Sequence, residues 1–165
     1  MYPDARIAPA RDGGVLLRLP PEERELLLQL RGELLSLFAN APDDPSLERL
    51  FPPAYDDERD AAEYRRLTQD ELQAGHREAL DVLESTAGRD RLTAEEADAW
   101  LRALNELRLV LGTRLDVRED TFAGGLDLGD PRAPELAVYG YLTWLQESLV
   151  EALSAKPGRR GRSDG

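Results

Sequence analysis

The chain of 165 residues contains no cysteine, one histidine and one methionine, and only 6% of its residues are aromatic. Without cysteine there is no disulfide, no thiolate nucleophile and no cysteine-ligated metal site. A single histidine cannot build a histidine metal site, so we expect a partly buried, hydrogen-bonded side chain at His76. The sequence also lacks a P-loop, a dinucleotide-binding glycine motif and a nucleophile elbow. We therefore expect a protein without catalytic residues, cofactor or bound metal.

Long apolar runs are missing as well. No segment approaches the roughly 20 uninterrupted apolar residues that a membrane-spanning helix needs. The first residues, MYPDARIAPARDGG, show no basic segment followed by an apolar run, which a signal peptide would have. We expect a cytoplasmic protein that makes no membrane contact.

Basic residues are outnumbered, with 21 lysines and arginines against 33 aspartates and glutamates, for a net charge of -12. The C-terminal segment SAKPGRRGRSDG is basic, so the rest of the chain is more acidic than the whole. An acidic body repels phosphate backbones, and a nucleic-acid partner is therefore not expected. A DNA-binding transcriptional regulator is the alternative, because a hairpin beside helices is compatible with a winged helix and Arg65 and Arg66 are adjacent on one helix. A ligand-binding enzyme is the third function class.

Turn and spacing patterns predict a mainly α fold. Asp12-Gly13 between two short apolar segments predicts an N-terminal β-hairpin. Apolar residues at helical spacing predict four principal helices, at about 21–39, 57–85, 93–114 and 134–154. Asp44 is placed to cap a short helical turn between the first two. We expect a helical bundle with an N-terminal hairpin, forming one domain over residues 1–154, and a disordered basic tail at 155–165.

Three positions on these helices stand out. Gly75 lies inside the long second helix and predicts either a kink or a close helix contact there. Thr93 and Glu96 have the spacing of a capping box at the start of the third helix. The fourth helix is apolar over more than half of its circumference, so it is either the central helix of the fold or one with an oligomer contact.

The helix at 93–114 carries polar side chains beside its apolar stripe. Arg108 and Arg114 lie at the two margins of that stripe, where their donors require carboxylate or carbonyl partners. We predict an inter-helix polar network in which Arg108 or Arg114 pairs with Glu63 or Glu147. The full candidate set is Glu63, Arg66, Asn105, Arg108, Arg114, Gln146 and Glu147. The alternatives are arginines that reach solvent alone and an anion or ligand site.

Aromatic residues on the last helix suggest self-association. Tyr139, Tyr141 and Trp144 cannot all face one neighbouring helix of a monomeric bundle, and aromatic residues are enriched at the centres of interfaces. A homodimer through these residues is predicted. The alternative is that the rest of the same chain covers every side of this helix.

Three ordered blocks of sequence resemble an uncharacterised actinobacterial family that is classed as a domain of unknown function. The blocks are DPSLERLFPPAYDDERDAAEYRRLT, WLRALNELRLVLGTRL and VYGYLTWLQESLVEAL, and the resemblance covers about residues 5–154. The positions that carry it are Pro53, Tyr55, Glu63, Arg66, Thr68, Asn105, Arg108, Gly112, Arg114, Gln146 and Glu147.

The resemblance implies a cytoplasmic protein and assigns no catalytic residues. Members are often encoded beside the ClpS protease adaptor and a JAMM-type metallopeptidase with a sulfur-carrier protein, and some are labelled transcriptional regulators. It therefore implies a link to proteolysis or sulfur metabolism. From the chain as a whole we expect a non-enzymatic interaction or regulatory protein with a protein partner.

Overall fold

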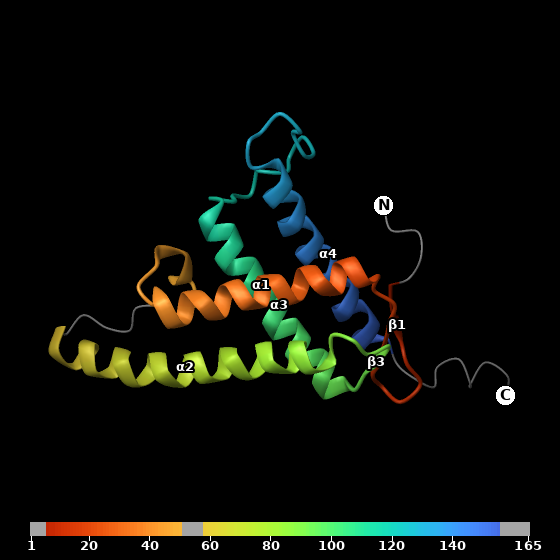
Figure 1. Ribbon diagram of the computed structural model, residues 1–165, viewed down its shortest axis with the longest axis horizontal. Coiled ribbons are helices and arrows are strands. Elements are labelled where there is room, and N and C mark those ends of the chain that lie inside the picture. Colours follow the sequence, from red (N-terminus) through yellow and green to blue (C-terminus); the bar gives the residue numbers. More distant parts are fainter. Residues whose placement is uncertain (1–5, 51–57, 156–165) are drawn as a thin grey trace, which may run out of the picture.

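The computed structural model describes residues 6–50 and 58–155, without the side chains at 58–66, 68 and 69. Its elements follow in the order β1 (Ile7–Pro9), β2 (Val15–Leu17), α1 (Pro21–Asn40), the 3-10 turn η1 (Pro45–Leu47), α2 (Glu58–Thr86), β3 (Arg91–Leu92), α3 (Ala94–Arg114) and α4 (Ala133–Ser154) (Figure 1). Four long helices and an N-terminal hairpin confirm the mainly α fold predicted from the sequence.

The small sheet has one strand more than the sequence predicts. β1 and β2 form the antiparallel hairpin, with Ile7 opposite Leu17, and β3 adds to β2 with Leu92 opposite Val15. The hairpin loop runs from Ala10 to Gly14 and contains Gly13 at a positive φ of 91°, but Asp12 is not at a positive φ, so the tight two-residue Asp-Gly turn that the sequence predicts is wrong while the hairpin is confirmed. β3 was missed because two residues are too short to show an alternating pattern.

Local sequence signals place the helix starts. Pro21 occupies the first turn of α1, where its missing N–H costs no hydrogen bond, and Glu22 and Glu23 face the positive end of the helix dipole. The predicted capping box of α3 is present, because the Thr93 side chain accepts from the Glu96 backbone and the Glu96 side chain accepts from the Thr93 backbone. Asp44 caps η1 by accepting from the backbone N–H of Ser46.

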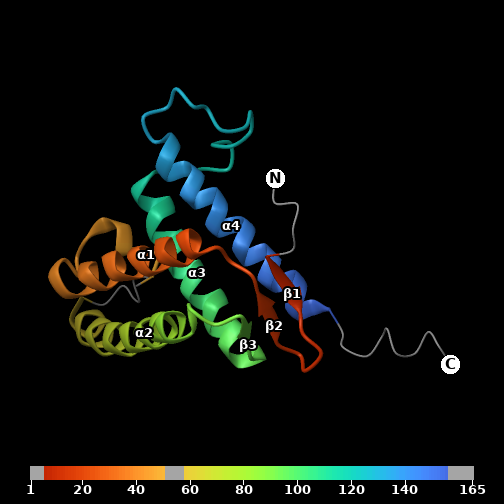
Figure 2. The same cartoon turned by 45° about the vertical axis from the view of Figure 1, so that its right-hand side comes forward.

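The central helix of the fold is α3, and the alternative that α4 is central is wrong. α3 packs against α2, α4, α1 and η1, whereas α4 packs against α3 and the two strands of the hairpin (Figures 1 and 2). The sequence pattern underestimated how much of the surface of α3 is buried, because part of that surface consists of alanines: Ala97, Ala99 and Ala103.

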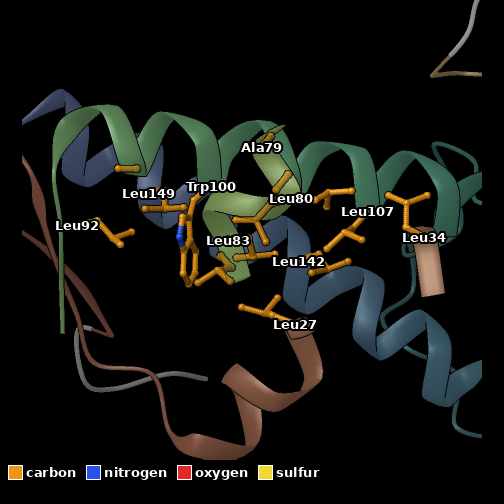
Figure 3. Close-up of a cluster of buried hydrophobic side chains, with 14 of the residues drawn as sticks. Leu27, Leu34, Ala79, Leu80, Leu83, Leu92, Trp100, Leu107, Leu142 and Leu149 are labelled. Atoms are coloured by element: carbon orange, nitrogen blue, oxygen red, sulfur yellow. The ribbon is translucent and has the colours of Figure 1, made fainter. Parts of the chain in front are cut away.

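The core lies where α1, α2 and α4 meet α3 (Figure 3). Trp100 is its largest fully buried side chain, and leucines from all four helices surround it. These include Leu27, Leu80, Leu83, Leu104, Leu142 and Leu149, each fully buried. Within the described residues, none of the helices combines the length and the apolar character that crossing a membrane requires.

Candidate functional site

A buried acid–histidine pair joins the two long helices α2 and α3. Nδ1 of His76 lies 2.6 Å from Oε1 of Glu106, and Nε2 of His76 lies 3.4 Å from the carbonyl oxygen of Leu50. The ring of His76 also stacks against that of Phe38, with 6.2 Å between the centroids. The histidine is therefore partly buried and hydrogen-bonded, as the sequence predicts.

Glu106 was not singled out in the sequence, although a signal was there. It is one of the few buried polar or charged side chains among the described residues, with 5% of its surface exposed. At 100° per residue it lies between Ala99, Ala103 and Val110 on a second apolar stripe of α3, beside the stripe that contains Trp100. A single acid inside a stripe of small apolar residues indicates a buried carboxylate that needs a partner.

The pair lines a cleft between η1, α2 and α3, and we call it the floor because Glu106 is the buried polar residue of the lining. The cleft has a volume of about 410 Å³, within the range of about 300–1,000 Å³ typical of small-molecule sites. Four of its lining residues, which we call the walls, are apolar: Leu50, Leu72, Gly75 and Leu109. Besides the pair, the polar lining residues, which we call the mouth, are Arg49, Glu71, Arg102 and Asn105.

Burial and mutual attraction set the charges of the pair. Burial raises the pKa of Glu106, and the hydrogen bond and charge of His76 offset part of that rise. Burial alone would lower the pKa of His76, but the hydrogen bond and charge of Glu106 outweigh it, so that the pKa of His76 is raised. Arg102 is near enough to favour the ionised form of Glu106. The geometry thus favours a histidinium paired with a carboxylate.

Gly75 faces the open space of this cleft. A Cβ atom added there would meet no atom within 4 Å, so the predicted close helix contact at Gly75 is wrong. α2 continues as one helix from Glu58 to Thr86 through this position. The glycine therefore leaves free volume in the cleft wall opposite the bulkier lining residues.

The structure describes only part of the predicted polar network. Asn105 Oδ1 accepts a long 3.5 Å hydrogen bond from Nη2 of Arg108 on the same helix. Nε of Arg108 and Oε1 of Gln146 are buried, without a hydrogen-bond partner among the described residues. Arg114 and Glu147 are exposed, and within the described residues no ion pair joins Glu147 to either arginine.

The other members of the network cannot be placed. The side chains of Glu63, Arg66 and Thr68 lie outside the part of the chain that the structure describes. Pro53 and Tyr55 lie outside it entirely. A pairing of Arg108 or Arg114 with Glu63 therefore stays a prediction. Of the members whose side chains the structure describes, only Asn105 lines the cleft, next to Glu106.

The three aromatic residues of α4 make contacts within the chain. Tyr141 is 8% exposed and belongs to the core, and its ring lies 6.0 Å from that of Trp144. Tyr139 stacks on Phe122, with 6.0 Å between the centroids and 9° between the ring planes. Tyr139 and Trp144 are partly exposed, so they are the two that a second copy could reach.

A second surface feature is the acidic loop, residues 116–132, between α3 and α4. It contains five acidic and two basic residues, and it lies at the far end of the α3–α4 pair from the sheet (Figures 1 and 2). Leu128 on this loop is 84% exposed and Leu126 is 37% exposed. The stacking of Phe122 on Tyr139 holds the loop against α4, and a 2.6 Å hydrogen bond from Nη1 of Arg132 to the Leu115 carbonyl ties its two ends together.

Metal ligands do not gather anywhere in the part of the chain that the structure describes. No group of three or more histidine, aspartate or glutamate side chains is arranged there to hold an ion. His76 and Glu106 form a pair without a third ligand of this kind, so the cleft has the chemistry of a hydrogen-bonding site.

Comparison with known proteins places these features in a family. The chain is 32% identical to proteins of Mycobacterium bovis and Mycobacterium tuberculosis that are named oxidative stress regulator AosR, over 82% of this chain and 80% of theirs. It is 36% identical to a Mycobacterium leprae protein whose AosR name is provisional, over 71% of this chain and 62% of that protein. No solved structure matches the chain significantly.

The family match extends over almost the whole sequence. It runs from residue 5 to residue 153 and so contains both the cleft and the acidic loop. The chain belongs to the family described as the domain of unknown function DUF2017.

Proposed function

We propose that this protein is a non-enzymatic regulatory protein that acts by binding a protein partner through the acidic loop. The observation that carries the proposal is Leu128, a leucine 84% exposed on a loop with an excess of acidic residues. The names of the mycobacterial relatives support the regulatory part of the proposal.

The chemistry of the loop indicates the kind of partner. Burying a leucine side chain contributes about 1.5–3 kcal/mol, which Leu128 forgoes in the isolated chain. Among the described residues, ion pairs engage Asp116 and Asp130 of the loop but leave Glu119, Asp120 and Asp127 without a cation. A basic surface with an apolar pocket would satisfy both features. Because Phe122 is stacked on Tyr139, the base of the loop is held in place before binding, which lowers the cost of ordering it.

The absence of cysteine limits how an oxidative signal could reach this protein. Within its 165 residues there is no thiol to form a disulfide or a sulfenic acid. Regulation by this chain would therefore follow from a change in its partner or in a bound ligand. The link to proteolysis or sulfur metabolism belongs to the proposal too, and it is supported by the family resemblance alone.

The test is a complementation experiment in the host organism with the gene deleted. Wild type, Leu128→Asp and the control Val150→Asp are expressed, and transcripts are compared before and after hydrogen peroxide. Val150 is a matched control because it is 49% exposed but lies on α4, away from the loop. We expect Leu128→Asp to behave like the deletion and Val150→Asp like wild type. Equal complementation by both variants would count against the loop as the contact surface.

Direct DNA binding by a transcriptional regulator is the alternative function. The side chains of Arg65 and Arg66, on which this alternative rests, lie outside the described residues. Purified protein is mixed with duplex DNA and the salt concentration is raised. A steep loss of affinity with salt would favour the DNA-binding alternative over protein contact.

Self-association is a separate part of the proposal. Tyr139 and Trp144 are the partly exposed aromatic residues of α4 that a homodimer would use. Light scattering at micromolar concentration measures the mass in solution, and a dimer should give twice the mass of one chain. The mass of a single chain at every concentration would rule the dimer out.

A further inference from the structure

One oxygen of the buried Glu106 carboxylate has no partner. His76 occupies Oε1, but Oε2 is buried and accepts no hydrogen bond from any residue that the structure describes. Leaving a buried acceptor of this kind unsatisfied is unfavourable, and more so for a charged group. Glu106 is one of the residues that line the cleft, so a donor that enters the cleft lies beside this carboxylate.

The mouth of the cleft carries the opposite charge. Arg49 at the end of η1 is exposed, and so is Arg102 on α3. Among the described residues, Arg102 makes only a long 3.7 Å ion pair with Asp98, which leaves most of its donors for another group. Glu71 lies on the α2 side of the mouth and adds one exposed acceptor.

Between floor and mouth the walls are apolar. Leu50, Leu72 and Leu109 line the cleft, and Gly75 leaves its side of the wall open. A ligand that fits must therefore have three parts: a cationic donor for Glu106, an anionic group for the arginines and an apolar group for the leucines.

We propose that this cleft binds a small zwitterion of the α-amino-acid class, with its ammonium group on Oε2 of Glu106 and its carboxylate at Arg102 and Arg49. The side chain of such a ligand would lie against Leu50, Leu72 and Leu109. The site goes beyond the protein-contact function proposed above and does not depend on it, because the cleft and the acidic loop share no residue.

Simpler ligands fit the same residues less well. An inorganic anion would meet the arginines but would also meet the carboxylate at the floor, which repels it. A plain amine would satisfy Glu106 but leave the arginines without an anion. A zwitterion is the smallest ligand that complements both ends.

The experiment titrates the full chain with each of the twenty L-amino acids and follows binding by calorimetry and by changes in amide NMR signals. We expect saturable binding of at least one apolar amino acid, with signal changes at Leu72, Gly75 and Leu109. For the best binder, the N-acetyl derivative removes the cation and the amide derivative removes the carboxylate. Each should bind at least about tenfold more weakly, since each loses a charged hydrogen bond.

Two variants locate the site. Glu106→Gln removes the charge at the floor and should weaken binding about tenfold or more, because charged hydrogen bonds are the stronger ones. Gly75→Leu fills the cleft without touching the pair, and it should abolish binding. The matched controls are Glu95→Gln, at an exposed acid of α3, and Gly32→Leu, at a helical glycine with equally open surroundings on α1.

The outcomes are decisive in each direction. If no amino acid binds saturably, or if the N-acetyl derivative binds as well as its parent, the proposal is wrong. It is also wrong if binding survives both Glu106→Gln and Gly75→Leu with circular dichroism spectra like that of wild type. If Glu106→Gln fails to fold, the comparison of Gly75→Leu with Gly32→Leu decides: loss of binding in Gly75→Leu alone supports the site, and equal binding by both variants contradicts it.

Discussion

Nε1 of Trp100 donates a 2.7 Å hydrogen bond to Oγ1 of Thr86, and that hydroxyl donates in turn to the carbonyl of Val82 at 2.6 Å. Both side chains are buried, at 0% and 1% exposure. The bond satisfies the one polar atom of the largest side chain in the core, which buried tryptophans generally require. It also fixes the end of α2 to the start of α3.

Replacing Thr86 by valine keeps the shape of the side chain and removes the hydroxyl. The indole N–H of Trp100 is then buried without an acceptor, which costs about 1–3 kcal/mol. The free energy of unfolding, measured by urea denaturation, should fall by that amount. Ser85→Ala removes an exposed hydroxyl one residue away and should leave the free energy of unfolding nearly unchanged. Equal stability of Thr86→Val and wild type would show that the bond contributes nothing.

The stability of the fold should depend on Arg24, so that even a conservative substitution there lowers the free energy of unfolding. Its guanidinium donates to four backbone carbonyls, those of Leu17, Leu19, Ala87 and Arg89, and so joins β2 and α1 to the segment before β3. Lysine keeps the charge, but its single ammonium group cannot reach all four carbonyls as the planar guanidinium does.

We expect Arg24→Lys to lower the free energy of unfolding by about 2–4 kcal/mol, because four carbonyls, three of them in part-buried hydrogen bonds, lose their donor at once. Thermal and urea unfolding measure the change. Arg91→Lys, at an exposed arginine of β3, is the control and should be nearly neutral. A loss no larger than that of the control would mean that the carbonyls find other donors.

The sequence predicted the elements of the fold far better than the contacts between them. Helix periodicity, the Thr93 capping box and the position of the N-terminal hairpin are local signals, and each is confirmed. Arg24 and Glu106 escaped notice because their roles depend on partners distant in the sequence, at Ala87 and at His76.

The predicted polar network shows the same limit. Arg108 was correctly placed at the margin of the apolar stripe of α3, since its side chain is half-buried. The hydrogen bond that the structure shows for Arg108 goes to Asn105 on α3 itself, and the pairing with Glu63 stays a prediction because that side chain lies outside the described residues. Helical spacing gives the direction of a side chain, but the packing of the helices decides what it meets.

Gly75→Ala should stabilise the protein. Alanine is favoured over glycine inside a helix by about 0.5–1 kcal/mol, and the added Cβ atom meets nothing within 4 Å. Gly32→Ala should give a similar gain for the same reason. Gly112→Ala should gain less, because its Cβ atom would lie 3.0 Å from Cε2 of Tyr139. Melting temperatures of the three variants test this order, and a gain at Gly112 as large as at Gly75 would contradict it.

The pair formed by His76 and Glu106 should make stability depend on pH with a definite sign. The pKa of His76 is raised in the fold, because Glu106 outweighs the effect of burial. The folded protein therefore holds the histidine proton to higher pH than the unfolded chain does. The stabilisation is complete below the unfolded pKa of histidine, about 6.5, and is lost as the pH rises through the higher folded pKa.

Other charges at the cleft act on the pair in both directions. Arg102 on α3 and Arg49 beside η1 favour the neutral histidine, whereas Glu71 on α2 favours the charged one. The ring of Phe38 on α1 covers His76 without adding a charge. Glu106 is the hydrogen-bonded partner, so its removal should dominate the response.

Wild type and Glu106→Gln should therefore differ in the sign of the slope. For wild type, the free energy of unfolding should fall between about pH 6 and pH 8, because the folded state binds more protons. In Glu106→Gln the burial of His76 lowers its pKa more than the hydrogen bond to the Leu50 carbonyl raises it, so the free energy of unfolding should rise over the same range. Urea denaturation at a series of pH values measures both slopes, with Glu95→Gln as the control that follows wild type. Parallel slopes in wild type and Glu106→Gln would show that Glu106 does not hold the proton on His76.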